Sequence, residues 1–187
     1  MRNNIIDSAQ KLFRLYGLKK TTMDDIANSL GKTKSAIYYY FTNKEDILQA
    51  VAEKEIKQGI DILNNAVNAA EHATEKMAAY IRTRFYTNQS IASFYGFPEE
   101  DYFEYHELIK KVRVELDKKE LNTITRILTK GNQENIFNVA DVELTALNLL
   151  NIIRGLEHTY LKKKDYTVLQ KEIDNILSIL LQGLLKR

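Results

Sequence analysis

The stretch TTMDDIANSLGKTKSAIYYYFTNK, residues 21–44, decides the fold of the N-terminal part of the chain. Thr22 is followed three residues later by Asp25, a capping-box pattern that predicts the start of a helix. Gly31 suits the turn that ends this helix, and Thr33 is placed to cap a second, shorter one. The sequence therefore predicts two short helices joined by a tight turn, as in a helix-turn-helix.

The second short helix carries side chains suited to a nucleic-acid backbone. Lys34 offers a positive charge to phosphate, and the first turn of a helix also presents free backbone N–H groups. Tyrosine rings can pack on sugar or on a thymine methyl group and donate their O–H to phosphate. Lys44 can hold the flanking backbone. The predicted DNA-binding residues are Thr22, Thr33, Lys34, Ser35, Tyr38, Tyr39, Tyr40 and Lys44.

Three consecutive tyrosines, residues 38–40, need not share one role. Successive residues of a helix point about 100° apart, so the three rings cannot occupy one buried face. We expect one of them, together with Phe41, to lie in the core. The alternative is that all three are only the core and rim of a small bundle.

Composition points to an all-α chain. Its 187 residues include only one proline and seven glycines. Because these residues mark turns and interrupt helices, their scarcity favours long helices. Cysteine is absent, which excludes disulfides and thiolate metal sites and fits a reducing cytosol. The N-terminus does not resemble a signal peptide, and no apolar run approaches the ~20 residues that span a bilayer. A cytoplasmic protein without membrane contact is expected.

Charge supports DNA binding only locally. The whole chain has a net charge of +2, whereas residues 19–44 hold five lysines and two aspartates, a net charge of +3.

The rest of the chain reads as further helices. A helix is expected over residues 4–16 with Gly17 as its C-cap. Thr42 or Asn43 is expected to start a further helix, where Thr42 to Glu45 matches another capping box. The helix that begins there keeps its apolar period to about residue 70, on the order of 40 Å, more than a three-helix head requires. We therefore predict a DNA-binding domain over residues 1–46 and a ligand-binding and dimerisation domain over residues 47–187. Further helices are expected at residues 74–91, 101–130 (one or two, ending at Gly131), 139–162 and 166–186.

The last two of these helices are the most apolar part of the chain. A surface helix needs one apolar stripe for its own core, and a second stripe indicates burial against a partner subunit. The alternative is a pair of central helices in a monomeric bundle. The predicted dimer interface consists of Leu150, Ile153, Leu156, Ile173, Ile176, Leu177, Leu180 and Leu184.

Aromatic residues gather between residues 85 and 105, where eight of the chain's eighteen phenylalanines and tyrosines lie. The cluster surrounds a helix break expected at Gly96 and Pro98. An aromatic cavity with a few hydroxyls suits a small, mostly apolar molecule; the alternative is that these rings fill the core. The predicted pocket residues are Phe85, Phe94, Tyr95, Tyr102, Tyr105 and His106.

Residues 5–50 closely resemble the TetR-type bacterial transcriptional repressors. The resemblance rests on Thr22, on Ile26 and Ala27, on Gly31 and Tyr38, and on Phe41 followed by residues 44–47. It implies a three-helix head joined by a long fourth helix to a ligand-binding domain that dimerises through its last two helices. It also places Thr33 to Ser35, Tyr38 to Tyr40 and Lys44 where family members touch DNA. Ser35 stands where glycine is common, and Tyr40 where histidine is frequent, so the operator sequence should differ.

The resulting hypothesis is a homodimeric repressor that binds a palindromic double-stranded DNA operator and is released by an unidentified, mostly apolar effector. A transcriptional activator of the same fold, or a helical protein–protein interaction module that does not bind DNA, are the alternatives. The three histidines lack the spacing of a helical zinc site, so neither metal nor cofactor is expected. No nucleophile, base and orienting acid are arranged for catalysis, so the chain is not expected to be an enzyme.

Overall fold

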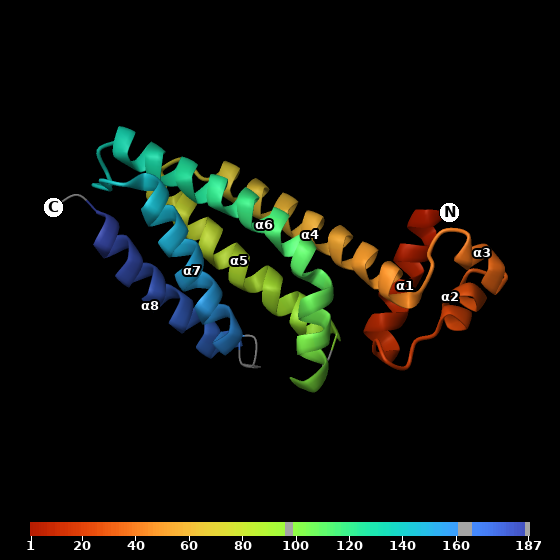
Figure 1. Cartoon of the computed structure of the whole chain (residues 1–187). Coiled ribbons are helices and arrows are strands. Elements are labelled where there is room, and N and C mark those ends of the chain that lie inside the picture. Colours follow the sequence, from red (N-terminus) through yellow and green to blue (C-terminus); the bar gives the residue numbers. More distant parts are fainter. Residues whose placement is uncertain (96–98, 161–165, 186–187) are drawn as a thin grey trace. The chain divides into compact units, whose positions relative to one another are not determined.

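A computed structural model describes the backbone of residues 1–95, 99–160 and 166–185, and the side chains of residues 1–87, 114, 116–156, 168 and 170–185. Within these ranges the chain is all-α, as predicted (Figure 1). Its helices are α1 (Arg2–Tyr16), α2 (Met23–Ser29), α3 (Lys34–Tyr38), α4 (Lys44–Ala69), α5 (Ala73–Tyr95), α6 (Glu99–Gln133), α7 (Val142–Tyr160) and α8 (Tyr166–Leu184).

The chain divides into two packing units. We call Met1–Gln58 with Ile91–Glu115 the N-terminal unit, and Gly59–Ser90 with Leu116–Arg187 the C-terminal unit. The helix α4 is continuous across residue 58. Each unit has its own apolar core among the described residues.

The predicted local signals of α2 and α3 are confirmed. The Thr22 hydroxyl accepts a hydrogen bond from the Asp25 N–H, while the Asp25 carboxylate accepts one from the Thr22 N–H at 2.8 Å. Gly31 has a φ of 62°, in the left-handed region that favours glycine, and so reverses the chain between the helices. Thr33 caps α3 through the Ala36 N–H.

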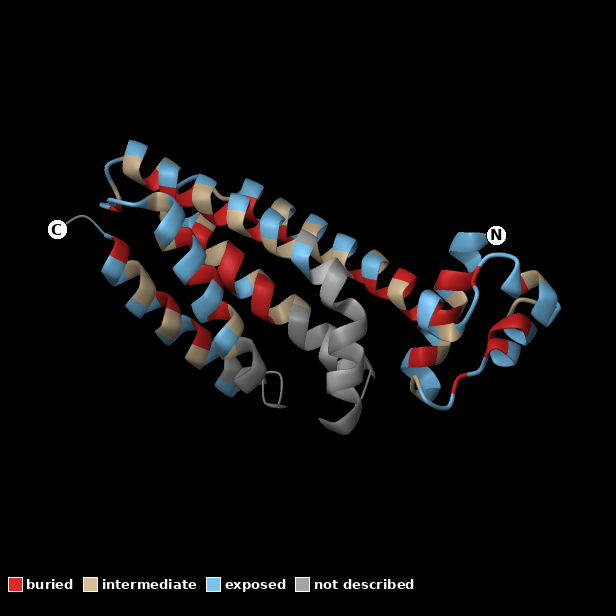
Figure 2. Cartoon of the chain, in the orientation of Figure 1, coloured by how far each residue is buried: buried red, intermediate tan, exposed pale blue. Residues whose placement is uncertain are grey.

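A compact apolar core holds α1, α2 and α3 against the first turns of α4 (Figure 2). We call α1, α2 and α3 together the head. Burying such side chains stabilises the fold by about 1.5–3 kcal/mol each. The buried members are Ile5, Ile6, Ala9, Phe13, Met23, Ile26, Ala27, Ile37, Phe41, Ile47, Leu48, Ala50 and Val51.

The structure decides between the two predicted starts of α4. Asn43, rather than Thr42, caps the helix: its side-chain oxygen accepts a hydrogen bond from the Asp46 N–H at 2.7 Å. The Asp46 carboxylate in turn accepts a bond from the Thr42 N–H. Two overlapping cap patterns were present, and the helix begins at Lys44, which selects the second of them.

The C-terminal unit buries a larger core drawn from α4, α5, α6, α7 and α8. It contains Leu63, Val67, Ala73, Met77, Tyr80, Ile81, Phe85, Ile124, Ile127, Leu128, Phe137, Val139, Ala146, Leu149, Leu150, Ile153, Ile173, Leu177 and Leu184. A buried ion pair between Arg84 and Glu120 lies within this unit and joins α5 to α6.

The prediction that a helix ends at Gly131 is wrong, because α6 continues through it to Gln133. Gly131 is required by packing rather than by a turn, since a Cβ there would overlap the ring of buried Phe137. The loop after α6 is then fixed by Asn132, whose side chain bonds both the N–H and the carbonyl of Val139.

Among the helices whose placement is described, none combines the length and hydropathy needed to cross a bilayer.

Candidate nucleic-acid interface

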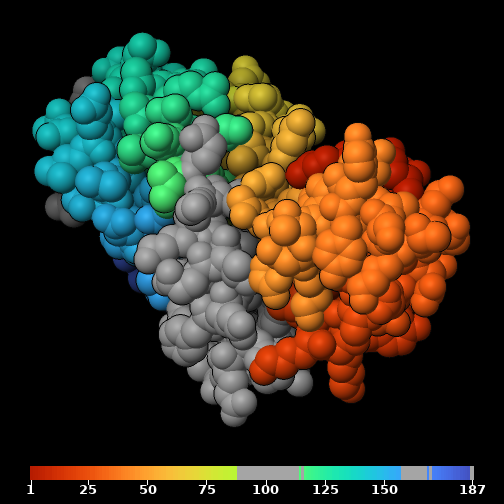
Figure 3. Space-filling model, turned by 45° about the vertical axis from the view of Figure 1, so that its right-hand side comes forward, coloured from red at the N-terminus to blue at the C-terminus, as the bar shows by residue number. Residues whose placement is uncertain are grey.

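The outer side of α3 and its flanks is exposed. Thr33, Lys34 and Ser35 all lie at the surface, whereas Ile37, further along α3, is fully buried. In the space-filling view the segment that contains α3, drawn in orange, lies at the surface (Figure 3). The structure therefore exposes hydroxyl, ammonium and tyrosine side chains along α3 and at its two ends.

None of the three tyrosines is buried, so the prediction that one of them belongs to the core is wrong. Tyr39 is 82% exposed, Tyr38 46% and Tyr40 40%. The physical reason is that Ile37 and Phe41, four residues apart, already fill the core from this segment. The rings of Tyr39 and Tyr40 pack edge to face with centroids 5.0 Å apart. Such packing limits the orientations that both rings can adopt.

Lys34 is already paired in the free protein. Its Nζ lies 2.9 Å from the Oδ2 of Asp24 on α2, and both side chains are about half exposed. The hydrogen bond and the charge of Asp24 raise the pKa of Lys34. An exposed ion pair of this kind contributes little to stability, so phosphate can compete for the ammonium group. Asp24 did not emerge from the sequence as a site residue.

Lys44 also has a structural role. Its Nζ donates a hydrogen bond to the carbonyl oxygen of Leu18 at 2.9 Å, which ties the α1–α2 loop to the start of α4. An ammonium group has three donors, so this contact leaves capacity for a phosphate. Lys44 thus fixes the loop as well as adding positive charge.

Thr22, another predicted site residue in this region, uses its hydroxyl to cap the start of α2. Its hydroxyl donates to the Asp25 carboxylate at 2.7 Å and accepts from the Asp25 N–H. The hydrogen bonds from Thr22 lower the pKa of Asp25.

Known proteins resemble this chain in sequence and in fold. The sequence model described as bacterial regulatory proteins, tetR family, matches residues 5–51, which include most of α1 and all of α2 and α3. A crystal structure of a transcriptional regulator from Cytophaga hutchinsonii is similar over 97% of both chains, with a TM-score of 0.82 and 25% sequence identity. The helix-turn-helix part of this chain is thus a tetR-type domain, as the resemblance predicted.

Curated relatives are similar over part of their length. The chain is 32% identical over 116 residues to the biofilm operon icaADBC HTH-type negative transcriptional regulator IcaR of Staphylococcus aureus strain Newman, covering 62% of this chain and 53% of that protein. The same regulator of Staphylococcus epidermidis is 40% identical over 63 residues, 34% of each chain. The chain thus spans about half the length of the first of these relatives.

The predicted effector residues are only partly within the described side chains. Phe85 is buried in the C-terminal core, on α5. Phe94, Tyr95, Tyr102, Tyr105 and His106 lie outside the residues whose side chains are described, as does the break predicted at Gly96 and Pro98. Among the described residues, no cluster of three or more metal-binding side chains is present.

The predicted dimer residues fall into two groups. Leu150, Ile153, Ile173, Leu177 and Leu184 are buried in the subunit's own core, and Leu156 and Leu180 pack against it, with Ile176 half-buried. Most of these side chains are therefore occupied within one subunit. A different set of apolar side chains on or next to α7 and α8 is exposed, namely Leu144, Leu147, Ile152, Ile179 and Leu185.

Proposed function

We propose that this chain is a transcriptional regulator that binds double-stranded DNA through α3. The observation that carries the proposal is the exposure of Lys34, Tyr38 and Tyr39 on α3 and directly after it. A helix-turn-helix lays its second helix in the major groove, where side chains from its N-terminal part reach base edges. Threonine, serine and lysine at the start of α3 would hold phosphates, and the tyrosines would contact sugars and bases.

The regulator acts as a homodimer. Leu147, Ile152 and Ile179 are large apolar residues exposed on α7 and α8, and exposed apolar surface of this kind marks interaction sites. A two-fold dimer presents two α3 helices to a palindromic operator whose half-sites lie one helical turn, about 34–36 Å, or a small multiple apart. The exposed apolar side chains of α7 and α8, which do not take part in each subunit's own core, then form the interface.

The regulator is a repressor that a small, mostly apolar effector releases. IcaR is by its name a negative transcriptional regulator, which supports repression here. The aromatic residues between positions 85 and 105 support an apolar effector. An effector that shifts the position of α4 would change the spacing of the two heads, with a coupling of typically ~1–3 kcal/mol.

Selection of random duplexes on the purified protein tests the proposed function. We expect a palindromic consensus, bound far more tightly than random DNA, with an affinity that falls steeply as salt rises. A salt-dependent affinity without any consensus would contradict an operator-specific regulator. Absence of binding to any duplex would support an interaction module instead.

A further inference from the structure

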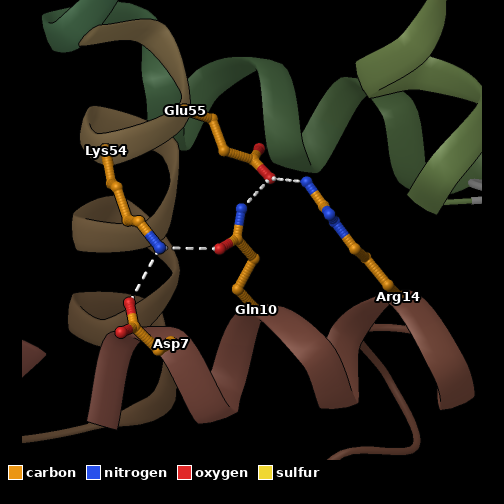
Figure 4. Close-up of polar contacts among 5 residues, drawn as sticks. All are labelled: Asp7, Gln10, Arg14, Lys54 and Glu55. Carbon is orange, nitrogen blue, oxygen red and sulfur yellow. Dashed lines mark hydrogen bonds and ion pairs between the residues drawn. The ribbon is translucent and has the colours of Figure 1, made fainter. Parts of the chain in front are cut away.

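A chain of polar side chains joins α1 to α4 immediately beyond the apolar core of the head (Figure 4). Asp7 and Gln10 of α1 both accept hydrogen bonds from the Lys54 Nζ, at 2.7 and 2.9 Å. The Gln10 side-chain amide donates to the Glu55 carboxylate at 2.7 Å, and the Arg14 guanidinium pairs with the same carboxylate oxygen at 2.9 Å. We call these five residues the α1–α4 clamp.

The clamp is built on helical spacing. Asp7, Gln10 and Arg14 recur at steps of three and four residues, so they share one side of α1. Their partners, Lys54 and Glu55, are consecutive residues of α4, one turn beyond buried Val51. Contacts at three levels along α1 therefore converge on one turn of α4.

The clamp is partly buried, and this makes its geometry strict. Only 4% of the Glu55 side chain is exposed, and Gln10 is also buried. A buried carboxylate is costly unless it keeps its hydrogen bonds, and hydrogen bonds weaken steeply when their angles are wrong. Apolar contacts, in contrast, are non-directional and tolerate small rotations of one helix on another. The clamp thus fixes the rotation of α1 about α4, which the apolar core alone would leave looser.

We propose that the α1–α4 clamp positions the DNA-reading head on α4 and thereby sets which half-site spacing the dimer accepts. The proposal rests on the proposed function, because it assigns a role to residues that hold α3 rather than to residues that touch DNA. The head core connects α1 to α2 and α3, so a fixed α1 carries α3 with it. Lys54 and Glu55 therefore hold α1 to a helix that continues as far as Ala69.

Operator spacing is a sensitive readout of this role. One added base pair moves a half-site by about 3.4 Å and rotates it by about 35°. A firmly held head cannot follow that rotation, whereas a loosened head can. The clamp side chains lie on α1 and α4, away from α3, so their removal should leave the contacts of each head with its own half-site intact.

The experiment measures the affinity of the full chain for duplexes containing the selected operator, the same half-sites one base pair closer or farther apart, and a single half-site. The variants are Glu55→Ala, which removes the centre of the clamp, and Glu55→Gln, which keeps an acceptor in place. Lys54→Met removes the more exposed end while keeping an apolar stem, and therefore tests the clamp even if Glu55→Ala fails to fold. Lys57→Ala, an exposed lysine on the same helix, is the control.

We expect wild type and Lys57→Ala to lose about tenfold or more in affinity when the spacing changes by one base pair. Glu55→Ala and Lys54→Met should lose only about two- to threefold, with single half-site affinity unchanged, and Glu55→Gln should recover part of the selectivity. Folded variants that keep the wild-type spacing preference, or that lose half-site affinity to the same extent, would overturn the clamp proposal. A wild-type protein that binds no duplex would instead overturn the proposed function itself, and the clamp proposal with it.

Discussion

The Lys34 Nζ lies 2.9 Å from the Oδ2 of Asp24, so the central cation of the proposed interface is paired with a carboxylate from the preceding helix. A phosphate that approaches Lys34 must replace Asp24 as its partner and tolerate the charge of that carboxylate nearby. Asp24 is therefore expected to weaken binding to any phosphate backbone that lacks compensating base contacts.

Asp24→Asn should raise the affinity for random duplex DNA several-fold and the affinity for the operator by less. The reason is that removing a negative charge beside Lys34 favours all phosphate contacts, which dominate non-specific binding. Fluorescence anisotropy at several salt concentrations measures both affinities. Asp61→Asn makes the same charge change on an exposed part of α4 and serves as the control. Equal effects of the two substitutions would contradict the role assigned to Asp24.

Asp25→Asn should lower the unfolding temperature at neutral pH and lose that effect in acid. Hydrogen bonds from Thr22 lower the pKa of Asp25 in the folded state. The stabilisation is therefore complete above the ordinary aspartate pKa of about 3.9 and is lost as the pH falls through the lowered value. Thermal unfolding of both proteins between neutral and strongly acidic pH checks this. A difference that stays constant across the whole range would count against the capping role.

Tyr39→Ala and Phe41→Ala should have opposite profiles, although the two residues are close in sequence. Tyr39 is 82% exposed, so its removal should change the free energy of unfolding by less than about 0.5 kcal/mol while altering preference among operator variants. Phe41 is buried, and its removal should cost about 3–5 kcal/mol. Urea unfolding and binding to an operator library separate the two effects. If Tyr39→Ala left the preference among operator variants unchanged, that result would contradict the assignment of Tyr39 to the DNA interface.

Lys44→Ala should affect both folding and binding. The carbonyl of Leu18 loses a hydrogen bond, which should lower the free energy of unfolding by about 1 kcal/mol. If Lys44 also contacts phosphate, the slope of the logarithm of the DNA-binding constant against the logarithm of salt concentration should become shallower by about one. Both are measured on the same protein by urea unfolding and by anisotropy. A stability loss with an unchanged salt slope would assign Lys44 to the loop alone.

Ile179→Glu should convert the dimer to monomers. Ile179 is exposed on α8, whereas Leu177 and Leu180 belong to the subunit's own core or pack against it. A charge at Ile179 should therefore spare the fold and disrupt a partner contact. Light scattering gives the mass, and circular dichroism reports whether the helices persist. Ile62→Glu on α4 is the control, since Ile62 is comparably exposed. An unchanged dimer mass for Ile179→Glu would place the interface elsewhere.

The local signals of the head could be predicted from sequence because each depends on residues close together in the chain. Thr22 with Asp25, and Gly31 at the turn, are short-range patterns, and the structure contains all of them. The sequence left two candidates for the cap of α4, because overlapping patterns at Thr42 and Asn43 differ by a single residue and only the position of the helix start distinguishes them.

Features that depend on tertiary packing could not be predicted in this way. Gly131 reads as a helix end, but it is there because Phe137 packs against it after the chain has turned back. Apolar residues cover a wide arc of α8, and sequence alone does not separate those that pack within the subunit, such as Leu177, from those that stay exposed, such as Ile179. Gln10 and Glu55 are 45 residues apart, and no local pattern links them.

The most direct test of the central claim compares wild type with a Lys34→Ala, Tyr39→Ala double variant on a selected operator and on random duplex, at low and at moderate salt. Both side chains are exposed, so the variant should unfold at the wild-type temperature. We predict that it loses operator affinity by about a hundredfold and nearly all preference over random DNA. Wild-type operator affinity in this folded variant would contradict the assignment of α3 as the DNA-reading helix.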